Sequence, residues 1–307
     1  MTGSGSVAPT SRSGSDGGSA AGAIAAGITG IDHTLVGVRD LEGARAAWRR
    51  LGFTLSPRGR HIGWGTANYC IMFEQGYIEL LGIVDPAQFT NNLDRFLERR
   101  EGLLGLAFGS DDGAETHRRL AAAGFHPDGP KDLKRALELP EGDALPAFKL
   151  VFLPPQETPG LSAFVCHHLT PELIRRPAWL AHANGATRLL GVTVVVDGPA
   201  ETAIGYAPLF GAEAVWVRDG AAEVETGGGW LRFVTPKDLT RLYPDAATIR
   251  DLPTPWMAAM TIGVAELGAT QDHLVAQGVP FTAAGSAALV VPPKAANGAL
   301  LEFRPDV

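Results

Sequence analysis

The chain has 307 residues, of which 45% are apolar and 19% charged, enough for one large or two ordinary domains with cores of their own. A net charge of -7 without Lys/Arg-rich runs argues against a nucleic acid or an anionic membrane as partner, and no apolar run approaches the roughly 20 residues of a membrane-spanning helix. Cys70 and Cys166 lie far apart and outside any Cys-x-x-Cys pair, so we expect neither a disulfide framework nor a thiolate zinc site, and a cytoplasmic location fits best.

The first 28 residues are mostly Gly, Ser and Ala, without an aromatic residue or a regular hydrophobic period. They lack the basic segment and the long Leu/Val-rich centre of a secretion signal. We therefore predict a disordered tail over residues 1–28.

A hydrophobic pattern then repeats along the chain. In its first copy, residues 31–38 alternate as a strand, residues 41–50 form an amphipathic helix, and residues 66–73 and 77–81 read as strands joined by a tight turn. Further copies begin at Leu103, Leu189 and Met257, the third with a helix over 200–209. The chain is thus predicted to hold four βαβββ modules of roughly fifty residues each.

One helix on a small sheet leaves a face of that sheet uncovered, so the modules must pair. Irregular or helical linkers lie at 85–100, 169–188 and 236–255. We predict an α+β protein of two domains, residues 29–187 with modules one and two, and residues 188–307 with modules three and four.

Three stretches of module one carry a family resemblance: IDHTLVGVRDLEGARAAWRRLGF, GRHIGWGTANYCIMF and GYIELLG. They resemble the glyoxalase-like branch of the vicinal oxygen chelate superfamily, most strongly over residues 30–187. The resemblance implies paired modules curled into a cup, with a divalent metal at its centre in the catalytic members. The fold also carries glyoxalases, extradiol dioxygenases, epimerases, antibiotic-modifying enzymes and metal-free binding proteins, so it does not name the reaction.

The first two metal-ligand candidates are His33 and Glu79. His33 shares a strand face with Ile31 and Leu35. Glu79 lies between apolar neighbours, where a carboxylate needs a cation or hydrogen-bond donors. The alternative is an ion pair between Glu79 and an arginine, for which Arg58 and Arg60 are candidates.

Module two departs from the family pattern, because its first strand offers no His, Gln or Glu as a third ligand. Its last strand ends in His167 and His168, of which only one faces inward, and His168 shares a face with Cys166. The run C-x-H-x-T-P-E resembles a motif of the branch and favours His168. A triad of His33, Glu79 and His168 suits one divalent ion, Fe, Mn, Zn or Ni.

The loop between the first helix and the second strand supplies the substrate-binding candidates. Its Arg60 is able to grip a carboxylate with two parallel hydrogen bonds, and Trp64 is its aromatic residue. Similarity to the G-x-H-x-x-x-G-T-x-N motif of the branch adds His61, Thr66 and Asn68. A glycine-rich turn without a ligand is the alternative interpretation.

In the second pair, Glu302 matches Glu79 but no residue matches His33, so we expect no metal there. The favoured function is a metal-dependent lyase, isomerase or dioxygenase acting on a small substrate that chelates the metal through vicinal oxygens. The alternatives are a metal-free binding or sequestration protein and, more weakly, a scaffold. The expected partner is a small molecule, with a homodimer left open.

Overall fold

The computed structural model describes residues 27–218, 221–244, 252–284 and 287–306. The predicted tail thus lies outside the described residues, except for its last two. Across the described ranges, no helix has both the length and the apolar character needed to cross a membrane.

The four predicted modules are all present, and the α+β fold class is confirmed. Modules one and two comprise β1 (Ile31–Gly37), α2 (Leu41–Arg50), β2 (Gly59–His61), β3 (Thr66–Met72), β4 (Tyr77–Ile83), α3 (Leu93–Arg99), β5 (Gly102–Gly109), α4 (Gly113–Ala122), β6 (Asp128–Leu137), β7 (Ala147–Phe152) and β8 (Ala163–His168). Modules three and four comprise β9 (Ala186–Val195), α5 (Pro199–Ile204), α6 (Ala207–Phe210), β10 (Val215–Arg218), β11 (Ala221–Glu225), β12 (Trp230–Val234), α7 (Pro236–Leu242), β13 (Trp256–Val264), α8 (Leu267–Ala276), β14 (Thr282–Ala284), β15 (Ala288–Val291) and β16 (Leu300–Pro305). The predicted division between residues 187 and 188 falls inside β9 and stays a prediction.

The predicted helix over 200–209 is instead two short helices, α5 and α6. Pro208 lies in the first turn of α6. Proline cannot donate the backbone hydrogen bond that a continuous helix needs, so the helix breaks and restarts there.

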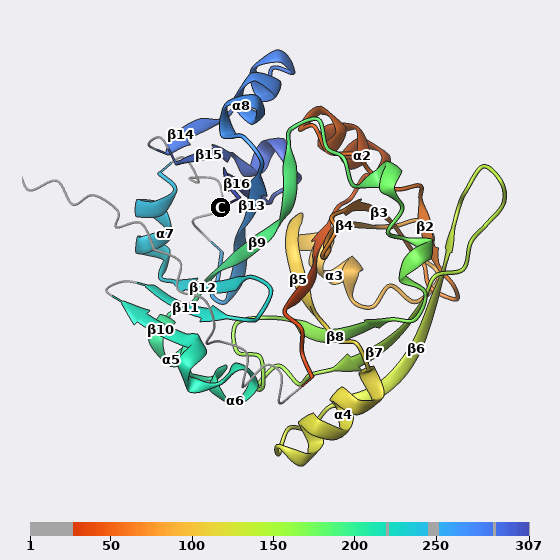
Figure 1. Ribbon diagram of the computed structural model, residues 1–307, viewed down its shortest axis with the longest axis vertical. Helices are drawn as coiled ribbons and strands as arrows, with labels where there is room; N and C mark the ends of the chain where they lie inside the picture. Colours follow the sequence, from red (N-terminus) through yellow and green to blue (C-terminus); the bar gives the residue numbers. More distant parts are fainter. Residues whose placement is uncertain (1–26, 219–220, 245–251, 285–286, 307) are drawn as a thin grey trace, which may run out of the picture.

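Strands of modules one and two form a closed barrel, in the order β1-β4-β3-β2-β6-β7-β8-β5 (Figure 1). In each module the last strand runs parallel to the first, so β1 pairs with β4 and β5 with β8. The three-residue strand β2 closes the barrel by pairing with β6, which places His61 opposite Arg135. The barrel thus joins the two modules along two seams, β1·β5 and β2·β6.

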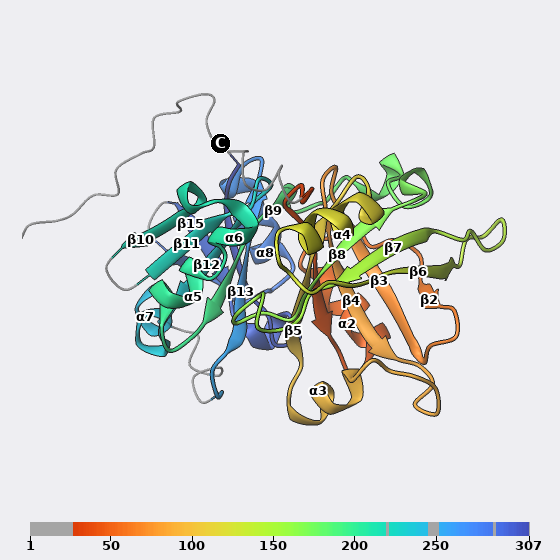
Figure 2. The ribbon, with the colours of Figure 1, turned by 90° about the horizontal axis from the view of Figure 1, so that it is seen from below.

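Modules three and four repeat the same strand order in an eight-stranded sheet that stays open, with β10 and β14 at its edges. Its central strand β13 lies against β5 of the barrel, and its central strand β9 contacts β4. The two sheets thus stand side by side (Figures 1 and 2). One hydrophobic cluster spans both sheets, including Val36 and Leu106 from the barrel and Val192 and Ile262 from the open sheet. The barrel and the open sheet therefore share a core.

Local sequence explains where the first module helices begin. Asp40 caps α2 by accepting a hydrogen bond from the backbone N–H of Gly43, and Asp112 caps α4 in the same way. Trp48 of α2 is fully buried against the barrel. The linkers after the first and third modules form α3 and α7, and α3 lies across one end of the barrel in both views (Figures 1 and 2).

Candidate functional site

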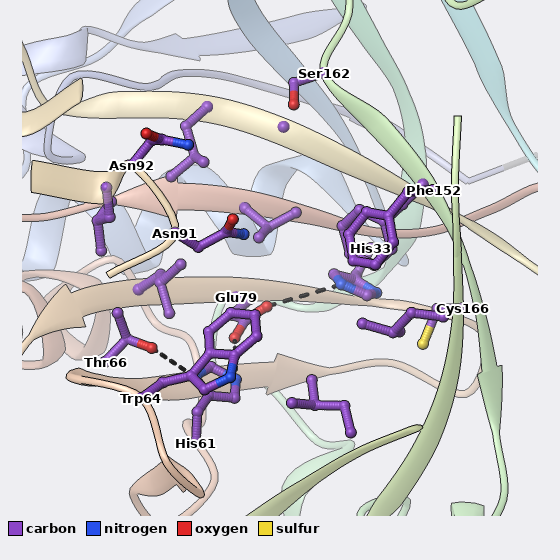
Figure 3. A pocket seen from close by; sticks show the side chains of 18 of the residues that line it. His33, His61, Trp64, Thr66, Glu79, Asn91, Asn92, Phe152, Ser162 and Cys166 are labelled. Atoms are coloured by element: carbon purple, nitrogen blue, oxygen red, sulfur yellow. Dashed lines mark hydrogen bonds and ion pairs between the residues drawn. The ribbon is translucent and has the colours of Figure 1, made fainter. Parts of the chain in front are cut away.

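A cavity of about 390 Å³ occupies the inside of the barrel under α3 (Figure 3). Its ionisable groups and their nearest polar neighbours come from β1, β2, β3, β4 and β6. They are His33, His61, Thr66, Tyr77, Glu79 and Arg135. Most of the remaining wall is leucine and phenylalanine, with Thr90, Asn91, Asn92 and Ser162 as further uncharged polar groups, so the cavity suits a small, largely apolar molecule with a polar end.

His33 is held by its neighbour Asp32. The pairing of β1 with β5 shifts register between Ile31 and His33, and this bulge lets the Asp32 carboxylate reach the His33 ring, 2.6 Å from Nδ1. His168 and His33 together hold the pKa of Asp32 well below its ordinary value although burial raises it, so Asp32 is ionised and accepts the Nδ1 proton. The Nε2 atom of His33, the other ring nitrogen, is then directed away from Asp32.

The Nε2 atom faces Glu79. His33 Nε2 lies 3.7 Å from Glu79 Oε2 (Figure 3). It also lies 3.4 Å from the Tyr77 hydroxyl, and the Tyr77 ring stacks on the imidazole. Burial raises the pKa of Glu79, but His61, His33, Arg135 and a 2.5 Å hydrogen bond from Asn68 lower it below its ordinary value. An ionised carboxylate and an imidazole nitrogen thus face one another across a gap too long for a hydrogen bond.

His61 and Thr66 line the same cavity. His61 Nδ1 lies 2.8 Å from the Thr66 hydroxyl, and its Nε2 lies 3.8 Å from Glu79 Oε1. Burial lowers the pKa of His61, so its ring is neutral at pH 7. Trp64 also lines the cavity, at the turn between β2 and β3.

Asn68 is buried and does not line the cavity. Its amide instead fixes the Glu79 carboxylate from behind. Asn68 therefore supports a site residue, where the sequence had suggested a substrate contact.

Arg60 does not reach the cavity. Its side chain is about half exposed and pairs with Glu138 at 2.7 Å and with Asp143 at 3.4 Å. Arg58 also pairs with Glu138, at 2.9 Å. Neither arginine is therefore the ion-pair partner considered for Glu79, because the short strand β2 presents Arg60 outward while His61, the next residue, faces in.

His168 lies on the other side of Asp32 from the His33 ring. Its Nε2 is 2.9 Å from Asp32 Oδ2, and its Nδ1 is buried without a hydrogen-bond partner. His167 points the opposite way, where its ring accepts a hydrogen bond from the backbone N–H of Gly113 at the start of α4. Within the described ranges, one group of metal-type side chains brings its ligand atoms within 4.8 Å of one another: Asp32, His33, Cys166 and His168.

The donor sets on both sides of His33 suit a transition metal. The group with Asp32 offers carboxylate, imidazole and thiol donors, and the unpaired Nδ1 of His168 shows that its hydrogen bonding is incomplete. On the cavity side, adjacent ligands on a tetrahedral ion are about 3.4 Å apart, close to the gap between His33 and Glu79. The structure does not bring Glu79 and His168 into one cluster.

Three residues that the sequence did not single out belong to this site, and one of them is Tyr77, whose ring stacks on His33. Asp32 was hidden by the bulge, which strict strand alternation cannot foresee. Arg135 lies on β6, a strand that the sequence pattern did not show. The spacing of Leu133, Arg135 and Leu137, an arginine between two leucines on one strand face, is the feature that would have revealed it.

Comparison with known proteins agrees with this architecture. Residues 31–210, more than half of the chain, match the family described as a glyoxalase-like domain. A hypothetical protein from Staphylococcus aureus has a similar solved structure, with a TM-score of 0.65, 13% identity, and coverage of 90% of this chain and 99% of its own. No curated protein matches the sequence.

Two further solved structures share the fold. A mutant of 4-hydroxymandelate synthase from Streptomyces coelicolor aligns with a TM-score of 0.52, 15% identity, and coverage of 91% of this chain and 94% of its own. A fusion protein of a xylose isomerase-like TIM barrel and 4-hydroxyphenylpyruvate dioxygenase aligns with a TM-score of 0.51 and 14% identity. The alignment covers 93% of this chain and 49% of the fusion protein. At these identities the likeness shows the fold alone.

Proposed function

Because the chain belongs to the glyoxalase-like domain family, we propose that it is a metal-dependent enzyme that binds a small substrate with vicinal oxygens in the cavity of its first domain. The proposal covers lyase, isomerase and dioxygenase reactions. The single observation that carries it is that two metal-type ligand atoms, His33 Nε2 and Glu79 Oε2, face one another across 3.7 Å on the cavity wall.

In this proposal His33 and Glu79 hold one divalent ion, Fe, Mn, Zn or Ni, on the cavity side. When bound, such an ion supplies Lewis-acid stabilisation of negative charge on substrate oxygens. Asp32 fixes the tautomer and orientation of His33, and Asn68 fixes Glu79, as carboxylates and amides commonly do behind ligating side chains.

His61 is the proposed proton carrier. Its neutral ring lines the cavity, and its Nδ1 contact with Thr66 holds the ring in place while Nε2 faces inward to Glu79. A neutral imidazole with a pKa below neutrality accepts a proton from a substrate and returns it without a large energetic cost.

The predicted third ligand, His168, stays a prediction. A metal on the Asp32 side of His33 would recruit His168, Asp32 and Cys166 in place of Glu79. We favour the cavity side because Asp32 already shares hydrogen bonds with both histidines, whereas His33 Nε2 and Glu79 Oε2 stand 3.7 Å apart beside the cavity.

The second candidate function is metal-free binding of a small molecule. The observation that favours it is that Asn68 and the nearby positive charge of Arg135 already stabilise an ionised Glu79. In such a protein the cavity would bind its ligand without chemistry.

Metal content separates the two functions. We expect the purified full-length protein, reconstituted and desalted, to hold about one divalent ion per chain by elemental analysis. Glu79→Gln should lower the metal affinity by about 100-fold or more, measured by chelator competition, because an amide is a poor ligand for these ions. Glu302→Gln, at the matching position of module four, is the control and should leave it unchanged. No metal above background after reconstitution contradicts the enzyme proposal and favours the binding protein.

A further inference from the structure

Arg135 is a buried cation without a carboxylate partner. Its side chain lines the cavity and the residue is 2% exposed. Its Nη1 donates to the Cys70 sulfur at 3.1 Å, and its Nε has no hydrogen-bond partner. Among the described residues, no Asp or Glu oxygen comes within the 4.0 Å of an ion pair.

The groups that touch Arg135 do not neutralise it. Burial raises the pKa of Cys70 to about 11, so its thiol is uncharged at pH 7. The Phe148 ring lies 5.4 Å from the guanidinium carbon and offers only a cation–π contact. Arginine keeps its charge at any physiological pH, and the ionised Glu79 acts on this charge only from beyond ion-pair distance. An anion that enters the cavity can therefore make the direct contact with the guanidinium that Glu79 does not make.

The polarity of the cavity wall around Arg135 indicates what kind of molecule would carry that anion. Arg135 stands directly across the β2·β6 pair from His61, among the polar groups of the wall. The rest of the wall is mostly apolar, with Leu35, Phe96 and Leu104 among its residues, and Thr90, Asn91, Asn92 and Ser162 add uncharged polar groups to it. A fitting ligand therefore has a charged end at the polar wall and an apolar body.

We propose that Arg135 binds the carboxylate of the substrate, so that the cavity takes a small monocarboxylic acid with an aliphatic or aromatic body. The planar guanidinium matches a carboxylate with two parallel hydrogen bonds. One arginine near the negative Glu79 favours a single negative charge over the double charge of a phosphate. The inference rests on the proposed function in calling the acid a substrate; binding of the acid itself needs no metal.

Two probes of one shape test this assignment in the unaltered full-length protein: 3-phenylpropionate and its neutral amide, 3-phenylpropanamide. We expect the acid to bind about 30-fold or more tightly than the amide by isothermal titration calorimetry, with or without EDTA, because the amide leaves the buried guanidinium uncompensated. Equal affinities, or binding of neither probe, would overturn the inference.

Variants locate the effect. Arg135→Gln should lower affinity for the acid by about 30-fold or more and leave the amide unchanged, while Arg135→Lys retains part of the preference. Arg60→Gln, on the outer face of the barrel, is the matched control and should change neither affinity. An Arg135→Gln protein that still prefers the acid excludes Arg135 as the carboxylate site; if that variant does not fold, the comparison of acid with amide decides alone.

The outcome is separable from that of the metal experiment. Binding of the acid to a protein that takes up no metal supports the carboxylate site and contradicts the enzyme proposal. Metal uptake without any preference for the acid over the amide supports the enzyme proposal and contradicts the carboxylate site.

Discussion

The barrel and the open sheet have the same strand order but different centres. In the barrel, the residue of β1 that pairs with the first residue of β4, Tyr77, is His33. Glu79 of β4 faces both His33 and the cavity. In the open sheet the same position holds Gly191 in module three, where a Cβ atom would collide with the indole of Trp230. A first-strand ligand has no room there.

Glu79 of the barrel and Glu302 of the open sheet, which occupy matching positions, also differ in their surroundings. Glu302 accepts hydrogen bonds from Thr261 at 2.7 Å and Tyr243 at 3.1 Å, and Arg304 binds its other oxygen at 2.7 Å. Tyr243 follows α7, which packs with it against the sheet in a separate apolar cluster. The linker helix thus fills the second cup, whereas α3 only covers the first. The cavity lined by His33 and Glu79 thus lies in the barrel, whereas Tyr243 and Arg304 occupy the matching place beside Glu302 in the open sheet.

In the barrel, Asp32 and His168 lie on the Nδ1 side of His33, and we expect metal affinity to depend on them. His168→Ala removes one of the two imidazoles that bind Asp32, so we expect a metal affinity about 10- to 100-fold lower, measured by chelator competition. His167→Ala should leave metal affinity unchanged, because that ring faces α4. A larger loss in His168→Ala than in Glu79→Gln would place the metal on the Asp32 side.

The open sheet is expected to reject a side chain at its centre. Gly191→Ala should lower the free energy of unfolding by about 1 to 3 kcal/mol, because the Trp230 ring must move. Gly268→Ala is the control, since a Cβ there meets nothing within 4 Å and the residue lies in helix α8. Urea unfolding of both variants measures the difference; equal stability would show that the second centre tolerates a ligand position.

The ion pairs of Glu138 with Arg58 and Arg60, near the β2·β6 closure of the barrel, should make a small, acid-sensitive contribution to the free energy of unfolding. Arg58, by hydrogen bonding, holds the pKa of Glu138 below its ordinary value, with Arg60 contributing. A lowered folded-state pKa contributes stability above the unfolded value of about 4.3, and this is lost as pH falls below it. Glu138→Gln should therefore cost about 0.5 to 1 kcal/mol at pH 7 and nothing at pH 3, measured by urea unfolding at each pH. A cost that persists at pH 3 would indicate packing as its cause.

The modules were predictable because each repeats a hydrophobic period that its own residues carry. His33 and Glu79 were found because a polar residue among apolar strand neighbours stands out in one sequence. The closure of β2 on β6 was not predictable, since a three-residue strand leaves no period. The pairing of β2 with β6 places Arg135 on the cavity wall and Arg60 on the outside of the barrel. Both placements were therefore missed for the same reason.

The closed barrel also determines how a ligand is exchanged. An open sheet offers an edge at which strands can separate, but a closed one does not, so a bound molecule leaves through an end of the barrel. At the end covered by α3, Leu93 and Phe96 stand over the cavity, and Gly65 donates a backbone hydrogen bond to Phe89 just before the helix. For a ligand that leaves by this end, we expect the residence time to depend on how often this segment opens, and the dissociation rate to respond to changes in α3 as well as in the groups that bind the ligand.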